Sequence, residues 1–172
     1  MCGDLQPQDS AVGRFLVSQP GSSVVTSLVA GEAVPKKIGL LDIRGDQFRL
    51  RPIPLTQVRT FVMGEVSLAD YQDLDQQDPK VQAKIKHVLT EEVELLIQQA
   101  KQKSQDLLKE ARMQGNIVAA ATEYPLENRL RNPDEVLVRL KVEHTGFSAL
   151  SNKSFGDSFV GKIANTVSQS CD

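Results

Sequence analysis

The first sixty residues alternate short hydrophobic runs with turn residues, which is a pattern of β-strands rather than of helices. The runs that predict strands cover residues 13–18, 22–28, 36–43, 47–55 and 58–66. Each run is rich in Val, Ile, Leu or Phe, and Gly, Pro or Asp residues separate most of them. This part of the chain is therefore predicted to be β-structure.

The two runs on either side of Gly45-Asp46 predict a hairpin, because a Gly in this position allows a tight two-residue turn. The stretch 38–41 before the turn is almost wholly apolar, which predicts a strand buried on both faces. After the turn, Arg49 and Arg51 are two positions apart, so their side chains are expected to share one face of the second strand.

The middle of the chain changes to a helical period. Asp78-Pro79 is a start signal, since Asp can cap a helix and Pro suits its first position. Apolar residues then recur at spacings of three and four, with one polar interruption around Ser104. A continuous helix over 79–113 would be about 50 Å long, whereas a globule of this chain length is only about 40 Å across. The helix is expected either to bend near Ser104 or to project from the body.

After the helix, residues 115–133 have a mixed composition that predicts a surface insertion. The strict alternation over 135–143 predicts a strand with one buried and one wet face. A short final helix is expected from about Ser154, with Asp157 at the third position in a loose capping box. The predicted fold class is α+β, with a mainly antiparallel sheet packed against one long helix and a short C-terminal helix.

Composition narrows the class of protein. The chain has 172 residues, a net charge of −2 and no Trp, so any core must come from aliphatic residues. No apolar run approaches the roughly 18 residues of a membrane span, and the first residues show no signal peptide. Cys2 and Cys171 form neither a disulfide framework nor a metal-binding spacing, which favours a reduced intracellular protein.

The distribution of charge is more informative than its sum. Residues 44–61 contain four basic residues and one acidic residue. The basic ones are Arg44, Arg49, Arg51 and Arg59, and the acidic one is Asp46. Such a basic strip can bind a polyanion, although arginines on a strand can also simply form its solvated face.

The residues that could carry catalysis or bind a metal do not form a recognisable motif. His87 and His144 each lack a second ligand at metal-binding spacing. The acidic segment 70–78 lacks the spacing of a calcium loop and instead leads into a helix cap. Without a nucleophile, a base and a stabilising group in one pattern, the chain alone is not expected to be a catalyst or to hold a cofactor.

Several longer strings are specific enough to indicate a family. They are Gln19-Pro20-Gly21-Ser22-Ser23-Val24-Val25-Thr26-Ser27-Leu28, Gly31-Glu32-Ala33-Val34-Pro35-Lys36-Lys37, Ile53-Pro54-Leu55-Thr56-Gln57-Val58-Arg59, Asp78-Pro79-Lys80-Val81, Leu137-Val138-Arg139-Leu140-Lys141-Val142 and Phe159-Val160-Gly161-Lys162-Ile163-Ala164-Asn165. In order and spacing, residues 14–165 resemble the eukaryotic meiotic-recombination double-strand-break repair nucleases, which are related to the bacterial SbcD nucleases. This family forms the nuclease subunit of a complex with nibrin and an SMC-like coiled-coil ATPase.

The resemblance implies a division of the chain. Residues 1–45 would be the terminal strands of a phosphoesterase domain whose catalytic part, with its two manganese ions, is absent. Residues 46–168 would be the capping, DNA-binding domain, with a variable insertion near 101–132. The Gly-His-x-His string that ends the metal site of the family does not occur in this chain, which is therefore expected to be a non-catalytic, cofactor-free piece of a manganese-dependent DNA nuclease with 3′–5′ exonuclease and endonuclease activity.

The function implied by the resemblance is to hold and orient double-stranded DNA over the active site through phosphate contacts. The expected contact residues are Lys36, Lys37, Arg44, Arg49, Arg51, Arg59, Arg139 and Lys141. The parent would act in the nucleus as a homodimer, with the ATPase and nibrin as partners and no membrane, in homologous recombination, meiosis and telomere maintenance. The alternative is a protein-interaction or dimerisation module, in which the long helix with its acidic residues Glu91, Glu92 and Glu94 and the extension to Asn132 bind a partner.

Overall fold

The computed structural model describes residues 6–10, 13–19, 21–55, 58–113, 135–148 and 150–166. Its strands are β1 (Gln6–Ser10), β2 (Gly13–Val17), β3 (Lys37–Arg44), β4 (Gln47–Pro54), β5 (Phe61–Ser67) and β6 (Leu137–Glu143). Its helices are α1 (Val81–Met113) and the short α3 (Asn152–Gly156), with 3₁₀ turns η1 (Ala30–Glu32), η2 (Leu68–Asp70) and η5 (Asp157–Phe159).

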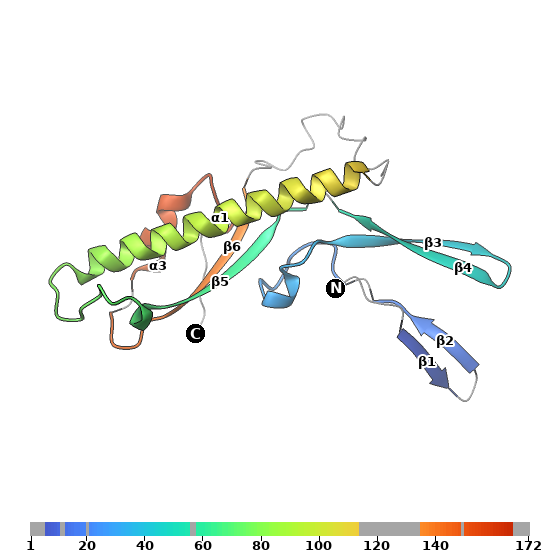
Figure 1. Ribbon diagram of the computed structural model, residues 1–172, viewed down its shortest axis with the longest axis horizontal. Helices are drawn as coiled ribbons and strands as arrows, with labels where there is room; N and C mark the ends of the chain where they lie inside the picture. Colours follow the sequence, from blue (N-terminus) through green and yellow to red (C-terminus); the bar gives the residue numbers. More distant parts are fainter. Residues whose placement is uncertain are drawn as a thin grey trace.

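The described residues form an elongated molecule in which α1 lies along the β5–β6 pair and two hairpins extend toward the opposite end (Figure 1). Strands β1 and β2 form one antiparallel hairpin, and β3 and β4 form the other. Mixed α+β structure with one long helix and a short C-terminal helix is confirmed. Two of the three strand pairs are antiparallel, but the pair that packs on α1 is parallel.

Strands β5 and β6 are parallel because α1 carries the chain back across them, the crossover that parallel pairing requires. In register, Val62 pairs with Val138 and Val66 with Val142. The predicted alternation of β6 is confirmed, since Val136 and Val138 are buried while Arg139 is exposed.

Helix α1 begins at Val81, two residues after the predicted start at Pro79, and Asp78 caps it as expected. The carboxylate of Asp78 accepts a hydrogen bond from the backbone N–H of Lys80 at 2.8 Å, and its carbonyl accepts one from the N–H of Val81. The helix then runs without interruption to Met113, so the predicted alternative of a bend near Ser104 is wrong.

The core lies between the buried stripe of α1 and the β5–β6 pair, and among the side chains before Phe61 whose burial is described, Pro54 alone is buried. One cluster contains Val62, Val93, Leu96, Ile97, Ala100, Val136, Val138, Phe159 and Ile163. A second contains Val66, Leu68, Ile85 and Leu89. The short elements α3 and η5 cover one end of this core through Phe155 and Phe159, whose rings meet edge to face at 5.3 Å.

Two predictions about the N-terminal strands are wrong. Residues 22–28 form no strand, because the carboxylate of Glu32 accepts hydrogen bonds from the backbone N–H groups of Thr26 and Ser27 and holds the segment in a curled loop. The run in β3 is not buried on both faces, since Leu41 is 53% and Ile43 69% exposed. The described residues place no layer over either face of the β3–β4 hairpin, which therefore leaves this apolar run in solvent.

The C-terminal end differs in detail from the sequence prediction. The cap of α3 is Ser151, whose hydroxyl accepts from the N–H of Ser154, three positions before the expected start. The predicted insertion at 115–133 lies outside the described residues. In the part of the chain that is described, no helix is long and apolar enough to cross a bilayer.

Candidate nucleic-acid interface

The β3–β4 hairpin carries one basic face. Gly45 takes a φ of 62° at the predicted turn, and the antiparallel register places Asp42 opposite Arg49 and Leu40 opposite Arg51. Side chains of paired residues lie on the same face, so Arg49 and Arg51 share a face as predicted.

On that face the two guanidinium groups converge on one carboxylate. An oxygen of Asp42 lies 3.0 Å from Nε of Arg51 and 3.3 Å from Nη2 of Arg49. The hydrogen bond from Arg51, followed by its charge and by the contact with Arg49, holds the pKa of Asp42 below its usual value. Arg44, beside the turn, is exposed and makes no ion pair within the described residues. The face thus keeps more positive than negative charge.

The opposite face of the same hairpin is apolar. Leu41 pairs with Leu50, and Ile43 pairs with Phe48. Phe48 is 50% exposed, and Gly39 leaves room beside Leu50, whose Cδ1 would lie 2.9 Å from a Cβ at that position. The hairpin is therefore amphipathic, with a charged face and an uncovered apolar face.

At the base of the hairpin, the two predicted lysines are less available. Lys36 lies 3.7 Å from the carboxylate of Glu32 and donates to the hydroxyl of Ser22 at 3.2 Å, and its side chain is only 10% exposed. Because the backbone N–H of Ser27 and further donors bind this carboxylate, the pKa of Glu32 falls to about 2. Lys36 therefore helps to order the loop, while Lys37, at the start of β3, is half-buried.

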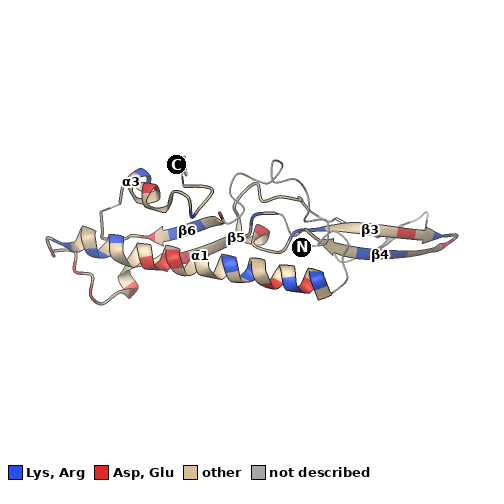
Figure 2. Ribbon diagram, turned by 90° about the horizontal axis from the view of Figure 1, so that it is seen from above, with Lys and Arg blue, Asp and Glu red and all other residues tan. Residues whose placement is uncertain are grey.

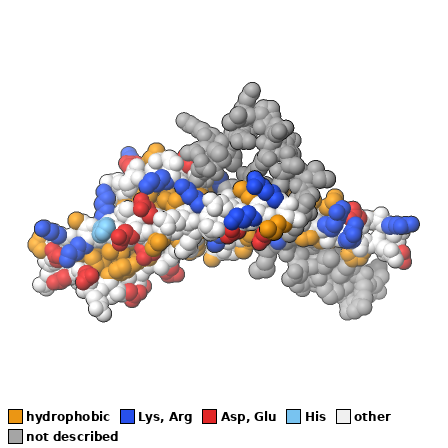
Figure 3. All heavy atoms as spheres, turned by 45° about the horizontal axis from the view of Figure 1, so that its top comes forward, with side chains coloured by type: hydrophobic (Ala, Val, Ile, Leu, Met, Phe, Trp, Pro, Cys, Tyr) orange, Lys and Arg blue, Asp and Glu red, His pale blue; other side chains and the backbone are white. Residues whose placement is uncertain are grey.

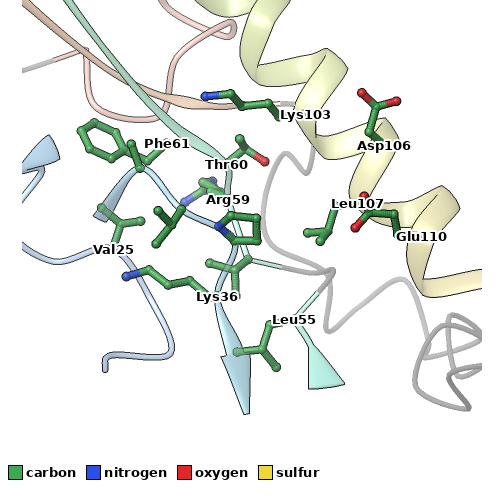
Figure 4. A pocket seen from close by; sticks show the side chains of 14 residues that line it. Val25, Lys36, Leu55, Arg59, Thr60, Phe61, Lys103, Asp106, Leu107 and Glu110 are labelled. Atoms are coloured by element: carbon green, nitrogen blue, oxygen red, sulfur yellow. The ribbon is translucent and has the colours of Figure 1, made fainter. Parts of the chain in front are cut away.

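Arg59 follows the hairpin in the chain, and its side chain is 26% exposed. Its Nη2 lies 3.5 Å from Glu135, and its Nε is buried with no hydrogen-bond partner among the described residues. It lines a cavity of about 260 Å³ between the N-terminal loop, the start of β5 and the second half of α1 (Figure 4). Lys103, Asp106 and Glu110 line the same cavity from the helix side.

The last two predicted residues lie on the outer face of β6. Arg139 donates to the backbone carbonyl of Leu28 at 3.0 Å, which ties β6 to the N-terminal loop. Lys141 pairs with Glu65 across the parallel ladder, and this contact raises the pKa of Lys141. Both charges are thus engaged within the chain.

The eight predicted contact residues therefore do not form one patch. Three lie on the hairpin face, three at the hairpin base and behind it, and two on β6. Of these, Arg44, Arg49 and Arg51 are the ones that combine exposure with a shared face.

The sequence interpretation missed a second group of cations, on the C-terminal part of α1, residues 101–112. Lys101, Lys103, Lys109 and Arg112 all lie within this helix and are exposed, against Asp106 and Glu110. Lys and Arg positions, coloured blue on the ribbon, lie along this part of α1 and on β3–β4 (Figure 2). A charge count restricted to residues 101–112 would have found them, because the acidic first part of the helix masks them in a longer window.

The acidic residues of the alternative hypothesis are also engaged within the chain. Glu92 accepts a hydrogen bond from the hydroxyl of Tyr71 at 2.9 Å, and Glu94 pairs with Lys162 at 3.1 Å. The Glu92 contact joins the residue after η2 to α1, and the Glu94 contact joins the C-terminal segment to α1. Both acidic side chains thus have a structural partner.

The described residues do not bring three His, Cys, Asp or Glu side chains together as metal ligands. His87 lies 3.6 Å from Glu91 on the exposed side of α1, and Nδ1 of His144 lies 3.2 Å from the carbonyl oxygen of Phe147.

Comparison of the sequence with known proteins identifies the family of this chain. The profile described as "Mre11 DNA-binding presumed domain" matches residues 48–168. A protein of Coprinopsis cinerea named "Double-strand break repair protein MRE11" is 41% identical over 92% of this chain and 20% of its own length. Proteins of the same name from Arabidopsis thaliana and Homo sapiens are 36% and 37% identical over 94% of this chain, with 19% and 20% of their own lengths covered. This chain spans about a fifth of the length of these curated relatives. With the greater part of its residues matched, the chain belongs to the Mre11 DNA-binding domain family.

Proposed function

We propose that this chain holds duplex DNA by phosphate contacts, as a non-catalytic capping module of a double-strand-break repair nuclease. The observation that carries the proposal is the basic face of the β3–β4 hairpin, where Arg44, Arg49 and Arg51 lie in solvent on one surface. Contacts of this kind bind DNA without reading its sequence, because phosphates are the same at every step. The description of the family as DNA-binding supports this assignment.

The other predicted cations contribute to the proposal in different ways. Lys37 shares the apolar face with Leu41 and Ile43 in the strand register, so it contributes charge near the base of the hairpin but not on the basic face. Lys36, Arg59, Arg139 and Lys141 act mainly by ordering the loop and sheet from which the hairpin projects. Their replacement should weaken DNA binding only through loss of local structure.

The activity of the longer protein is part of the same proposal. The relatives are named as double-strand break repair proteins, and we infer a nuclear nuclease whose two manganese ions are held by residues other than those described here. DNA held on the hairpin would be oriented toward that catalytic part. The SMC-like ATPase, nibrin and a second copy of the parent are the proposed partners.

The experiment that tests DNA holding is titration of a fluorescent duplex with the full chain. The variant Arg49→Glu/Arg51→Glu should weaken binding and flatten its salt dependence, because phosphate contacts release counterions. A matched control is Lys80→Glu/Lys153→Glu, which makes the same charge change at two exposed lysines away from the hairpin. Equal affinity of the wild type and the hairpin variant would reject the proposal.

A second candidate function is a protein contact through the apolar face of the same hairpin. The observation that favours it is the exposure of Leu41, Ile43 and Phe48 on one surface. Light scattering of the chain, together with pull-downs of ATPase and nibrin fragments, separates the two functions. A variant Ile43→Ser that loses a partner but keeps DNA affinity would support the protein contact.

A further inference from the structure

We propose that the C-terminal part of α1 carries a second line of phosphate contacts, formed by Lys101, Lys109 and Arg112, and that one duplex lies across both this line and the hairpin face. The inference rests on the proposed function, which it extends by a second surface and by an orientation of the DNA. The line is called the α1 basic line below.

The three cations share one flank of the helix. At about 100° per residue, positions 101, 109 and 112 fall within about 80° of one another around the axis. The cavity-lining residues Lys103, Asp106, Leu107 and Glu110 lie on the other side, facing the N-terminal loop (Figure 4). Glu110 therefore lies on the cavity side and Asp106 lies between the cavity and Lys109, with which it pairs, while Lys101 and Arg112 are turned away from the cavity.

The cations of the line are available for a ligand. All three are exposed, and Lys101 and Arg112 make no ion pair within the described residues. Lys109 lies 3.5 Å from Asp106, with 63% of its side chain exposed. An exposed pair of this kind is weak, so a phosphate can replace the carboxylate as the partner of Lys109.

The charge on this flank of α1 changes from negative to positive along the helix. Glu91 and Glu94 occupy the positions around the axis that Lys109 and Arg112 occupy further along. Glu94 is paired with Lys162 and Glu91 is exposed, so the middle of this flank offers a polyanion no net positive charge, whereas its end attracts it (Figure 2). This contrast places the DNA across the hairpin end of the molecule rather than along the whole helix.

The α1 basic line and the hairpin face lie close enough to act together. Glu110 near the end of α1 and Leu55 just after β4 line the same cavity, so the helix ends beside the base of the hairpin. Basic side chains over both elements are visible on one face of the molecule (Figure 3). From 101 to 112 the line is about 16 Å long, which corresponds to about five phosphates of one strand at 3.4 Å each.

The test compares the salt dependence of duplex binding by three triple variants of the full chain. One removes the α1 basic line (Lys101→Gln, Lys109→Gln, Arg112→Gln), and one removes the hairpin cations (Arg44→Gln, Arg49→Gln, Arg51→Gln). The matched control removes three exposed lysines that make no side-chain ion pair in the described structure (Lys80→Gln, Lys86→Gln, Lys153→Gln). Binding is measured by fluorescence anisotropy of a labelled 20-base-pair duplex between 50 and 200 mM salt, and circular dichroism checks that the helix content is unchanged.

Each phosphate contact contributes about 0.9 to the slope of log K against log salt. Loss of the α1 basic line should therefore lower the slope by up to about 2.7, so that affinity falls about 40-fold less over this salt range. The control should leave the slope within experimental error of the wild type. A slope that falls for the hairpin variant alone would overturn this inference and leave the proposed function intact.

Two other outcomes are also decisive. Unchanged slopes in both the helix and hairpin variants would reject the proposed function and with it the α1 basic line. An equal fall in the control and the helix variant would show that only net charge matters, which would overturn the second line.

Discussion

Replacement of Asp42 is the sharpest test of DNA binding by the hairpin face. The Asp42 carboxylate pairs with the same guanidinium groups that would contact DNA phosphates. Its oxygen lies 3.0 Å from Nε of Arg51 and 3.3 Å from Nη2 of Arg49. A phosphate bound on the other edge of either guanidinium would lie about 6 Å from this carboxylate, given about 3 Å per charged hydrogen bond. The substitution Asp42→Asn removes that repulsion with little change in side-chain volume.

The size of the effect follows from Coulomb's law. Two unit charges about 6 Å apart in water change a binding constant about threefold, and one phosphate on each arginine would raise this to about tenfold. Asp42→Asn should therefore bind a duplex about three- to tenfold more tightly at about 10 mM salt, where the Debye length is about 30 Å. At about 0.15 M the gain per phosphate should fall below about twofold.

The assay is fluorescence anisotropy of a labelled duplex at both salt concentrations. Asp157→Asn makes the same change in net charge on η5, at the other end of the molecule (Figure 1), and should leave affinity nearly unchanged. An Asp42→Asn variant that binds no more tightly than wild type would refute the reasoning. An equal gain in both variants would indicate a general effect of net charge instead.

Further predictions concern the elements that support this face. Gly64→Ala should lower the free energy of unfolding by about 1–3 kcal/mol in urea titrations, because its Cβ would lie 2.9 Å from Cδ1 of the buried Leu96; Gly31→Ala, which meets open space, is the control. Asn165→Ala should cost about 1–3 kcal/mol in the same titration, since its amide pairs with both backbone groups of one residue in β6, and a change under about 0.5 kcal/mol would contradict this role. Glu32→Gln should speed amide exchange in residues 21–36. Since the pKa of Glu32 is lowered from 4.5 to about 2, its stabilisation is complete above about pH 4.5 and is lost as the pH falls through about 2, so the exchange difference from wild type should shrink over that range.

The elements set by local chemistry could be predicted from the sequence. The start of α1 follows from Asp78 and Pro79 alone, and its buried stripe follows from the spacing of Ile85, Leu89 and Val93. The Gly45 turn likewise needs only the two residues between β3 and β4. Each of these features depends on residues within a few positions of one another.

Features that depend on residues far apart in the sequence could not be predicted from it. The parallel pairing of Val62 with Val138 joins positions on either side of α1, and nothing in either strand marks its partner. The exposure of Ile38 and Leu41 was missed because an apolar run does not reveal what covers it.

The candidate site was predicted in part for the same reason. Sequence alternation correctly placed Arg49 and Arg51 on one face. Asp42 lay just outside the basic strip along the chain, yet the antiparallel register brings it opposite Arg49. Neutralisation of the strip by Asp42 is therefore a property of strand pairing and not of local composition.

The segment after η5 lies along the edge of β6 that does not pair with β5. Ala164 donates to the carbonyl of Val136, whose own N–H bonds to the carbonyl of Lys162, and the amide of Asn165 satisfies both backbone groups of Val138. An uncovered strand edge is a template for pairing with other chains. A chain cut before residue 162 should therefore keep most of its helix but associate through β6, so soluble expression of this domain depends on residues 162–165, which lie outside every regular element.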